Sequence, residues 1–364
     1  MSSTKSSRSE TPLVGRDPAF AGMDQTAKRK SSHVDIVLNE QIDYYKSTGL
    51  EKYEFVHNAL PEIDYAEIDT TVKFLSHKFS APIIVSSMTG GFKRAGYINA
   101  ALAEFCKEKN IGMGVGSQRQ ALENSDYLET FKVVRRTAKD IFVMSNIGAA
   151  QVADGFALDK VRKIIDMVEA DALAVHLNAL QELIQFEGDK NFCGVVKGIS
   201  KLVEKIKIPV IVKETGAGIG ADAAKKLIGA GVSAIDVSGA GGTSWAAIET
   251  LRRTDKRIGR KFWNWGIPTA DALIQVNSLP SRKKIKLISS GGIRDGLDVA
   301  KSIALGADIC AAAQPFLKAL DKDGVKGLVK EFDAWVEELK GAMFLTGSKN
   351  LAQLKKAKLL KVTI

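Results

Sequence analysis

Four polar side chains gather in the sequence HLNALQE (176–182), and their types suit a phosphorylated substrate. Glu182 could hold Mg²⁺ against a diphosphate, because this ion prefers one or two carboxylates together with phosphate oxygens. The presence of Asn178 and Gln181 beside it favours the interpretation of His176 as a site residue. Two plainer interpretations stay open, in which Glu182 is only a favourable partner for a helix N-terminus and His176 is a core residue.

Two glycine-rich segments are suited to binding phosphate. The sequences SGAGGT (238–243) and SGGIRD (290–295) each follow an apolar run. Glycine lets backbone N–H groups approach an anion closely, and the dipole of a following helix adds to the attraction. The alternative is that these glycines serve tight turns without a ligand.

Basic side chains point to a strongly acidic substrate. Arg29 and Lys30 stand shortly before His33, and Arg119 follows an apolar run. The guanidinium group of arginine matches phosphate oxygens well. The alternative for Arg29 and Lys30 is that they are solvated charges of a terminal tail.

Lys213 ends the apolar run PVIVKE (209–214). A lysine in such a place is costly unless it faces a site or has a partner. It therefore either lines a binding site or forms an ion pair with an acid such as Glu214.

These residues must be positioned by a regular alternation of short apolar runs with segments of helical period. Near-continuous apolar strands separated by helices indicate a parallel sheet, and eight such units predict a (β/α)8 barrel. A doubly wound open sheet fits less well, because no GxGxxG sequence opens a helix after a first strand. The expected strands are 82–87, 111–116, 141–146, 172–177, 209–214, 234–239, 286–291 and 307–312.

Apart from Arg29, Lys30 and His33, the polar residues named above lie at the ends of these expected strands or directly after them. In a barrel the carboxyl ends of the strands lie at one face, where active sites are built from the loops. The loop after the seventh strand is the usual phosphate site of such barrels, and flavin mononucleotide (FMN) is a frequent occupant. Beside a flavin, Lys213 could neutralise charge on the reduced ring.

We expect one domain, residues 29–364, with an N-terminal substrate-binding segment and C-terminal helices, preceded by a disordered tail at 1–28. The tail is rich in Ser, Lys, Gly and Pro and has little periodicity. A helix is expected around 33–38, and another over 297–306 that closes on Gly306. Four lysines are expected on an exposed helix face, at positions Lys355, Lys356, Lys358 and Lys361.

Composition and charge narrow the range of possible functions further. The formal net charge of +10 arises from the stretches 1–32, 251–261 and 347–364, which carry +3, +5 and +5. No recognisable nucleic-acid-binding module carries this charge, so we expect no nucleic-acid partner. No apolar run approaches about 18 residues and no secretory signal is evident, so we expect no membrane span. Three cysteines without a CxxC pair favour reduced thiols and a cytoplasmic location.

Taken together, the motifs resemble the type 2 isopentenyl-diphosphate isomerases, an FMN-dependent family. The resemblance covers residues 29–349 in the family's order, and the whole set is far more specific than any one motif. The matching segments are RKSSH (29–33), MTGG (88–91), GVGSQR (114–119), SNIG (145–148), HLNALQE (176–182), VKE (212–214), SGAGGTSW (238–245) with IE (248–249), WGIPT (265–269), GGIR (291–294) and LTGSK (345–349).

The resemblance implies an isomerase that interconverts isopentenyl and dimethylallyl diphosphates. It implies reduced FMN, NADPH as the reductant, bound Mg²⁺ and a homo-oligomer, a tetramer or an octamer. The FMN-binding residues would be Met88, Thr89, Ser117, Asn146, Lys213, Ser238, Thr243, Gly291, Gly292, Arg294 and Ala313. The substrate-binding residues would be Arg29, Lys30, His33, Arg119, His176, Asn178 and Gln181. Glu182 would bind the metal, and the catalytic set would be Gln181, Glu249, His176 and Lys213.

Two positions depart from the family's pattern. The family often has Asn where Ala217 stands and an aliphatic residue where Gln314 stands. Two rival functions were weighed: another FMN-dependent oxidoreductase of the same barrel class, and a non-catalytic barrel that binds a phosphate ligand. An α-hydroxy-acid oxidase would need a histidine late in the barrel, whereas the last histidine of this chain is His176.

Overall fold

The computed structural model describes residues 24–153 and 157–363. Residues 1–23 of the predicted tail lie outside this part of the chain. The first helix, α1 (Gln25–Asn39), is longer than expected, because the side chain of Asp24 accepts a hydrogen bond from the N–H of Ala27 and so caps it. The described chain therefore becomes regular inside the segment that was predicted to be a tail.

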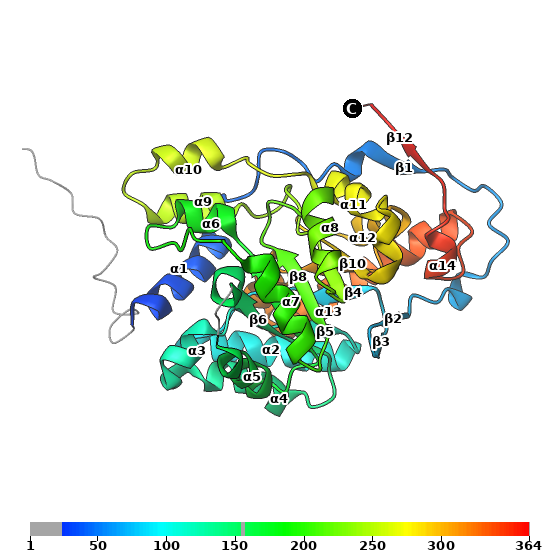
Figure 1. The fold of residues 1–364 in the computed structure, drawn as a ribbon. Coiled ribbons are helices and arrows are strands. Elements are labelled where there is room, and N and C mark those ends of the chain that lie inside the picture. The colour runs from blue at the N-terminus through cyan, green and yellow to red at the C-terminus, as the bar shows by residue number, and fades with distance from the viewer. Residues whose placement is uncertain (1–23, 154–156, 364) are drawn as a thin grey trace, which may run out of the picture.

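Eight parallel strands close into a barrel, so the predicted fold is confirmed (Figure 1). Each predicted apolar run contains one strand. The strands are β4 (Ile83–Val85), β5 (Gly112–Gly114), β6 (Val143–Gly148), β7 (Ala172–Leu177), β8 (Val210–Glu214), β9 (Ala234–Asp236), β10 (Lys286–Ser290) and β11 (Ile309–Ala312). Nearly every residue of these strands is buried, as expected where helices cover one face and the barrel core covers the other.

A hairpin fills the amino-terminal end of the barrel. Strands β2 (Val72–Phe74) and β3 (His77–Phe79) pair antiparallel. Phe74 packs edge-to-face on Phe142, which directly precedes β6, at 6.0 Å between ring centroids. Both rings belong to one apolar cluster with the inward side chains of the strands. Apolar packing therefore closes this end of the barrel, so a ligand site is expected at the other end.

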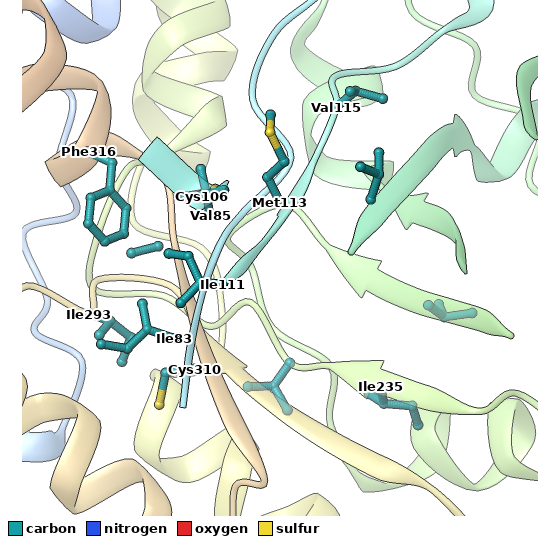
Figure 2. Close-up of a cluster of buried hydrophobic side chains, with 14 of the residues drawn as sticks. Ile83, Val85, Cys106, Ile111, Met113, Val115, Ile235, Ile293, Cys310 and Phe316 are labelled. Atoms are coloured by element: carbon teal, nitrogen blue, oxygen red, sulfur yellow. The ribbon is translucent and has the colours of Figure 1, made fainter. Parts of the chain in front are cut away.

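Helices surround the barrel and cover the outward side chains of the strands. Figure 2 shows this second core, where Ile83, Val85 and Met113 meet Cys106 and Phe316. The helices are α2 (Lys93–Lys109), α3 (Arg119–Glu123), α4 (Glu129–Thr137), α5 (Leu158–Met167), α6 (Ala179–Ile184), α7 (Val195–Lys205), α8 (Ala221–Gly229), α9 (Trp245–Arg252), α10 (Arg257–Phe262), α11 (Thr269–Asn277), α12 (Gly296–Ala304), α13 (Gln314–Leu345) and α14 (Leu351–Leu354). None of them, among the described residues, is long and apolar enough to cross a membrane.

The predicted helix over 297–306 corresponds to α12. It ends two residues before the predicted boundary, and Gly306 follows its cap with a φ of +113°, a backbone angle that favours glycine. A Cβ at position 306 would clash with the side chain of Asn277. The predicted C-cap glycine is therefore confirmed in function, although the helix boundary differs by two residues.

The predicted helix face of C-terminal lysines is wrong. Lys355, Lys356 and Lys358 follow the short helix α14, and Lys361 lies in strand β12 (Leu359–Lys361). This strand pairs antiparallel with β1 (Tyr53–Phe55), about 300 positions earlier in the chain. A pairing over such a distance leaves no local signal in the sequence.

We predict that Phe105→Ala lowers the free energy of unfolding by about 3–5 kcal/mol. Phe105 is fully buried in α2 and packs on Phe316 and Phe332 at 5.7 and 5.8 Å between ring centroids. Tyr97→Ala on the same helix is the matched control, because that ring is exposed and its loss should change stability by less than about 0.5 kcal/mol. Urea unfolding measures both variants, and equal losses would contradict this description of the core.

Candidate active site

A cavity of about 450 Å³ opens at the carboxyl ends of the barrel strands. That volume lies in the range of small-molecule sites. Every predicted site residue except Glu249 lines it. They come from α1, from the last residues of strands β6, β7 and β8 and from the segments that follow the strands, namely Arg29, Lys30, His33, Met88, Thr89, Ser117, Arg119, Asn146, His176, Asn178, Gln181, Glu182, Lys213, Ser238, Thr243, Gly291, Gly292, Arg294 and Ala313. The sequence therefore located the cavity wall correctly, while the role of each residue stays a prediction.

The end of β7 places His176 against Asn146 on the neighbouring strand, with 2.8 Å between Nδ1 and Oδ1. The amide nitrogen of Asn146 donates to the carbonyl of Val115, so its oxygen is the acceptor. We therefore assign the proton of His176 to Nδ1. Burial, reinforced by the charges of Lys213 and Lys30, lowers the pKa of His176 to about 3. The ring is neutral at neutral pH and turns Nε2 toward the cavity.

Lys213 lines the cavity but does not form the ion pair that was the alternative for it. Its Nζ donates to the main-chain carbonyl of Glu214 at 2.6 Å. The Glu214 carboxylate instead accepts the backbone N–H groups of the following loop, including those of Thr215 and Gly216 at 2.6 Å each. Asp236 lies opposite Lys213 on β9. Burial raises the pKa of both Asp236 and Glu214, and the nearby Lys213 opposes that rise. Lys213 therefore lines the cavity with two buried carboxyl groups near it.

The two glycine-rich loops pack directly on each other at the cavity rim. Gly291 and Gly292 have φ of +96° and +77°. A Cβ at Gly242 would lie 2.5 Å from the backbone nitrogen of Gly292, and one at Gly291 would overlap the backbone of Gly239. Only glycine fits this close backbone contact. The arrangement brings backbone groups of both loops to one place, as a phosphate cradle requires.

Helix α1 carries its basic face toward the cavity, so the alternative of solvated tail charges is wrong. Lys30 donates to the carbonyl of Ser117 at 2.7 Å. Arg29 forms an ion pair with Glu187 at 3.3 Å. His33 contacts Glu249 at 2.8 Å and meets the ring of Trp245 edge-on at 5.1 Å.

Glu249 lies one layer behind the cavity wall and is only 1% exposed. Its Oε1 accepts from Gln181 Nε2 at 3.3 Å as well as contacting His33, and its Oε2 accepts from Arg252. Burial raises the pKa of Glu249, but the charges and hydrogen bonds of His33 and Arg252 outweigh it and lower that pKa to about 2. Gln181 therefore stands between an ionised carboxylate and the cavity.

Glu182 opens α6 and is held by two donors. Its Oε1 accepts from Asn178 Nδ2 at 2.8 Å, and its Oε2 accepts from the N–H of Asp189 at 2.7 Å. Within residues 24–153 and 157–363, no cluster of three metal-ligating side chains is present. A metal ion here would thus have Glu182 as its carboxylate ligand and would need further oxygens from the substrate, which is the pattern that Mg²⁺ accepts.

Four residues of this region were not singled out as site residues from the sequence. Gln118 is fully buried and joins the ends of two strands, because its Oε1 accepts the N–H of Asn146 at 2.9 Å. Glu214 was considered only as an ion-pair partner. Arg252 lies three positions after Glu249 on one helix, a spacing that could have marked it as a partner. Nothing in the sequence around Glu187 marks it as a site residue.

The sequence has close relatives among known proteins. The model of the FMN-dependent dehydrogenase family matches residues 137–361. An isopentenyl-diphosphate delta-isomerase of Chlorobaculum parvum is 47% identical over 347 residues, which are 91% of this chain and 96% of the relative. The enzyme of that name from a Nostoc species is 46% identical over 342 residues, 93% of this chain and 97% of the relative.

Solved structures share the fold at much lower identity. A flavocytochrome b2 variant with benzoylformate has a TM-score of 0.65 at 17% identity, covering 91% of this chain and 79% of the other. A mandelate oxidase with benzoyl-formic acid has a TM-score of 0.62 at 15% identity, covering 92% and 95%. These two likenesses concern the barrel alone.

We predict that His176 remains neutral from pH 8 to pH 5 when no anion is bound. In the unfolded chain its ordinary pKa of 6.5 applies, whereas in the folded chain the pKa is about 3. Acidification below pH 6.5 therefore protonates the unfolded chain first, and His176 lowers the stability of the fold progressively toward pH 3. Ring-carbon NMR shifts of His176, assigned by their loss in His176→Gln, should stay constant over this range. A titration midpoint near 6.5 would contradict the geometry.

Proposed function

The chain belongs to the FMN-dependent isopentenyl-diphosphate delta-isomerases, and from this membership we propose how its cavity binds the diphosphate substrate and moves the double bond. The reaction adds a proton at one carbon of isopentenyl diphosphate and removes one from another, which yields dimethylallyl diphosphate without net redox change. The charge that develops resembles a tertiary carbocation. The protein must therefore hold the alkene, shield that charge from water and move two protons.

The cavity fits FMN in two respects. The glycine loops after β9 and β10 touch through backbone atoms and both line the cavity, so a phosphate there could approach their backbone N–H groups closely. The buried oxygens Ser87 Oγ and Thr89 Oγ1, together with the amide nitrogen of Gln314, have no hydrogen-bond partner among the described residues. Polar ring atoms of a flavin would satisfy such groups. The departure at Gln314 thus adds a donor to the site rather than removing one.

We assign FMN to the residues predicted for it from the sequence, with the phosphate at the glycine loops and Arg294 and the ring beside Lys213. When bound in reduced form, FMN supplies an electron-rich ring that stabilises positive charge on the alkene and a nitrogen that can exchange a proton. Lys213 offsets negative charge on that ring. Asp236, whose Oδ1 accepts from Ser290 Oγ at 2.6 Å, lies opposite the lysine on β9.

The diphosphate would bind at the end of the cavity that α1 covers. Arg29 and Lys30 meet Arg119 there, so that three side chains of permanent positive charge face one space. His33, His176 and Asn178 complete the predicted set, with Glu182 holding Mg²⁺ against the diphosphate oxygens. This convergence of the α1 cations on the same cavity as the glycine loops is the observation that carries the proposal.

The proton path would run through Gln181. Its amide nitrogen donates to Glu249, and its side chain lines the cavity. Glu249 is ionised at neutral pH and so can accept a proton, while Gln181 orients the group that exchanges it. His176, being neutral, can position the substrate without adding a further charge near the alkene.

The proposal also includes NADPH as the source of reducing equivalents, a homo-oligomer of four or eight chains and a cytoplasmic location. The family resemblance supports the first two, and the three unpaired cysteines agree with a reducing compartment. An α-hydroxy-acid oxidase function is disfavoured, because the oxidase structures share only the fold at 15–17% identity and His176 is the last histidine of the chain.

The decisive assay uses the full chain loaded with FMN and reduced anaerobically by NADPH in the presence of Mg²⁺. Isopentenyl diphosphate should then be converted to dimethylallyl diphosphate, and the oxidised protein should give no product. A flavin that is reduced without product formation would favour the oxidoreductases instead. A protein that does not bind FMN would refute the assignment of the glycine loops.

We predict that Glu182→Gln raises the Mg²⁺ concentration needed for half-maximal activity by about 10-fold or more, because it removes the carboxylate charge from the metal. The flavin spectrum should not change, since Glu182 lies on α6 and away from the glycine loops. Glu129→Gln is the matched control, because that carboxylate pairs with Arg136 on the exposed surface. An unchanged Mg²⁺ requirement in Glu182→Gln would remove Glu182 from the metal site.

A further inference from the structure

A chain of alternating charges runs from the buried Glu249 to the helix that carries the diphosphate-binding residues. Arg252 Nη1 donates to Glu249, and Nη2 of the same side chain donates to Glu187 Oε1 at 3.3 Å. Arg29 on α1 donates to that same Oε1, also at 3.3 Å. One carboxylate oxygen thus joins two arginines that belong to elements far apart in the sequence.

A carboxylate such as that of Glu187 is unexpected in the wall of a cavity that only binds an anion. It lines the same cavity as Arg29 and Arg119, and its side chain is 30% exposed. A carboxylate in such a wall repels a diphosphate and competes with it for the nearest cation. None of the roles proposed above for the site residues uses Glu187, so its placement requires a separate explanation.

We propose that Glu187 is a positioning residue. It holds Arg29 in an ion pair until the diphosphate binds, and the loss of that ion pair then changes the contact between Arg252 and Glu249. The inference rests on the proposed function, since it takes the ligand of α1 to be a diphosphate. When Arg29 turns to the phosphate oxygens, Glu187 retains only Arg252. The guanidinium of Arg252 is then drawn toward Glu187, and Glu249 loses part of the charge that keeps it ionised.

Arg252 can carry this effect because it is the permanent cation beside Glu249. His33 also contacts Glu249, but burial lowers the pKa of His33 while Glu249 opposes the shift, so the charge of His33 depends on pH whereas that of an arginine does not. From α6, Glu249 meets only the neutral Gln181. Helix α10 also packs on α9, but its charged side chains line a separate surface hollow, formed by residues 254–257 with Arg260 and Lys261. Weakening the Arg252 contact would therefore raise the proton affinity of Glu249 when substrate is present.

The variant Glu187→Gln tests this coupling in the full, FMN-loaded protein. Inorganic diphosphate should bind about 3- to 10-fold more tightly by calorimetry, because no carboxylate competes for Arg29. The kcat for isopentenyl diphosphate should fall about 10-fold, because Arg252 then contacts Glu249 alone and keeps that carboxylate ionised. The KM should fall together with kcat, a pattern that a simple loss of folding would not produce.

Two further variants make the result specific. Glu187→Asp keeps the charge and should restore a Kd within about twofold of the original chain. Asp321→Asn removes an equal charge from Arg94, which also contacts α1 at Asp35 but lies outside the cavity, and should leave Kd and kcat unchanged. Circular dichroism and the flavin spectrum confirm that each variant is folded and loaded.

The outcomes separate this inference from the proposed function. If the original chain neither binds diphosphate nor turns over substrate, the proposed function fails and the coupling fails with it. If the original chain does both, but Glu187→Gln binds diphosphate equally or more weakly while remaining folded, the proposed function stands and the coupling is overturned.

Discussion

A carboxylate that is removed from water must be paired, and in this protein that constraint ties the active site together. Glu249 is 1% exposed and takes its partners from three separate elements, His33 of α1, Gln181 of α6 and Arg252 of its own helix. An uncompensated charge at this depth would cost several kcal/mol. The contact between His33 and Glu249 therefore ties α1 to this buried charge, and Arg29 and Lys30, which we propose bind the diphosphate, lie on the same helix.

Most of the fold could be predicted because parallel barrel strands are recognisable one at a time. Each of the eight is a short apolar run buried on both faces, so local composition is enough to find it. Pairing between distant segments is different. Nothing near Lys361 indicates that its strand pairs with β1, and the extent of α1 depended on a cap at Asp24 that lies in a polar, unpatterned stretch.

The site shows the same division between local and distant signals. Most of the predicted residues that line the cavity lie at the ends of strands or directly after them, so the sequence identified them. Gln118, Glu187 and Arg252 act on other residues rather than on a ligand, and their partners lie on different elements or behind the cavity wall. Glu214 was considered only as an alternative ion-pair partner of Lys213, whereas its carboxylate binds the main chain of its own loop. Supporting contacts of this kind become visible only when the fold is known.

The hairpin of β2 and β3 closes one end of the barrel. Figure 1 shows α1 and this hairpin on opposite sides of the barrel, and Phe74 and Phe79 fill the end that the hairpin covers. Under the proposed assignment, a flavin ring among the strand ends and a diphosphate under α1 would both enter and leave at the opposite end. The flavin would then have to enter first and leave last, so the cofactor would be retained for as long as substrate or product is bound.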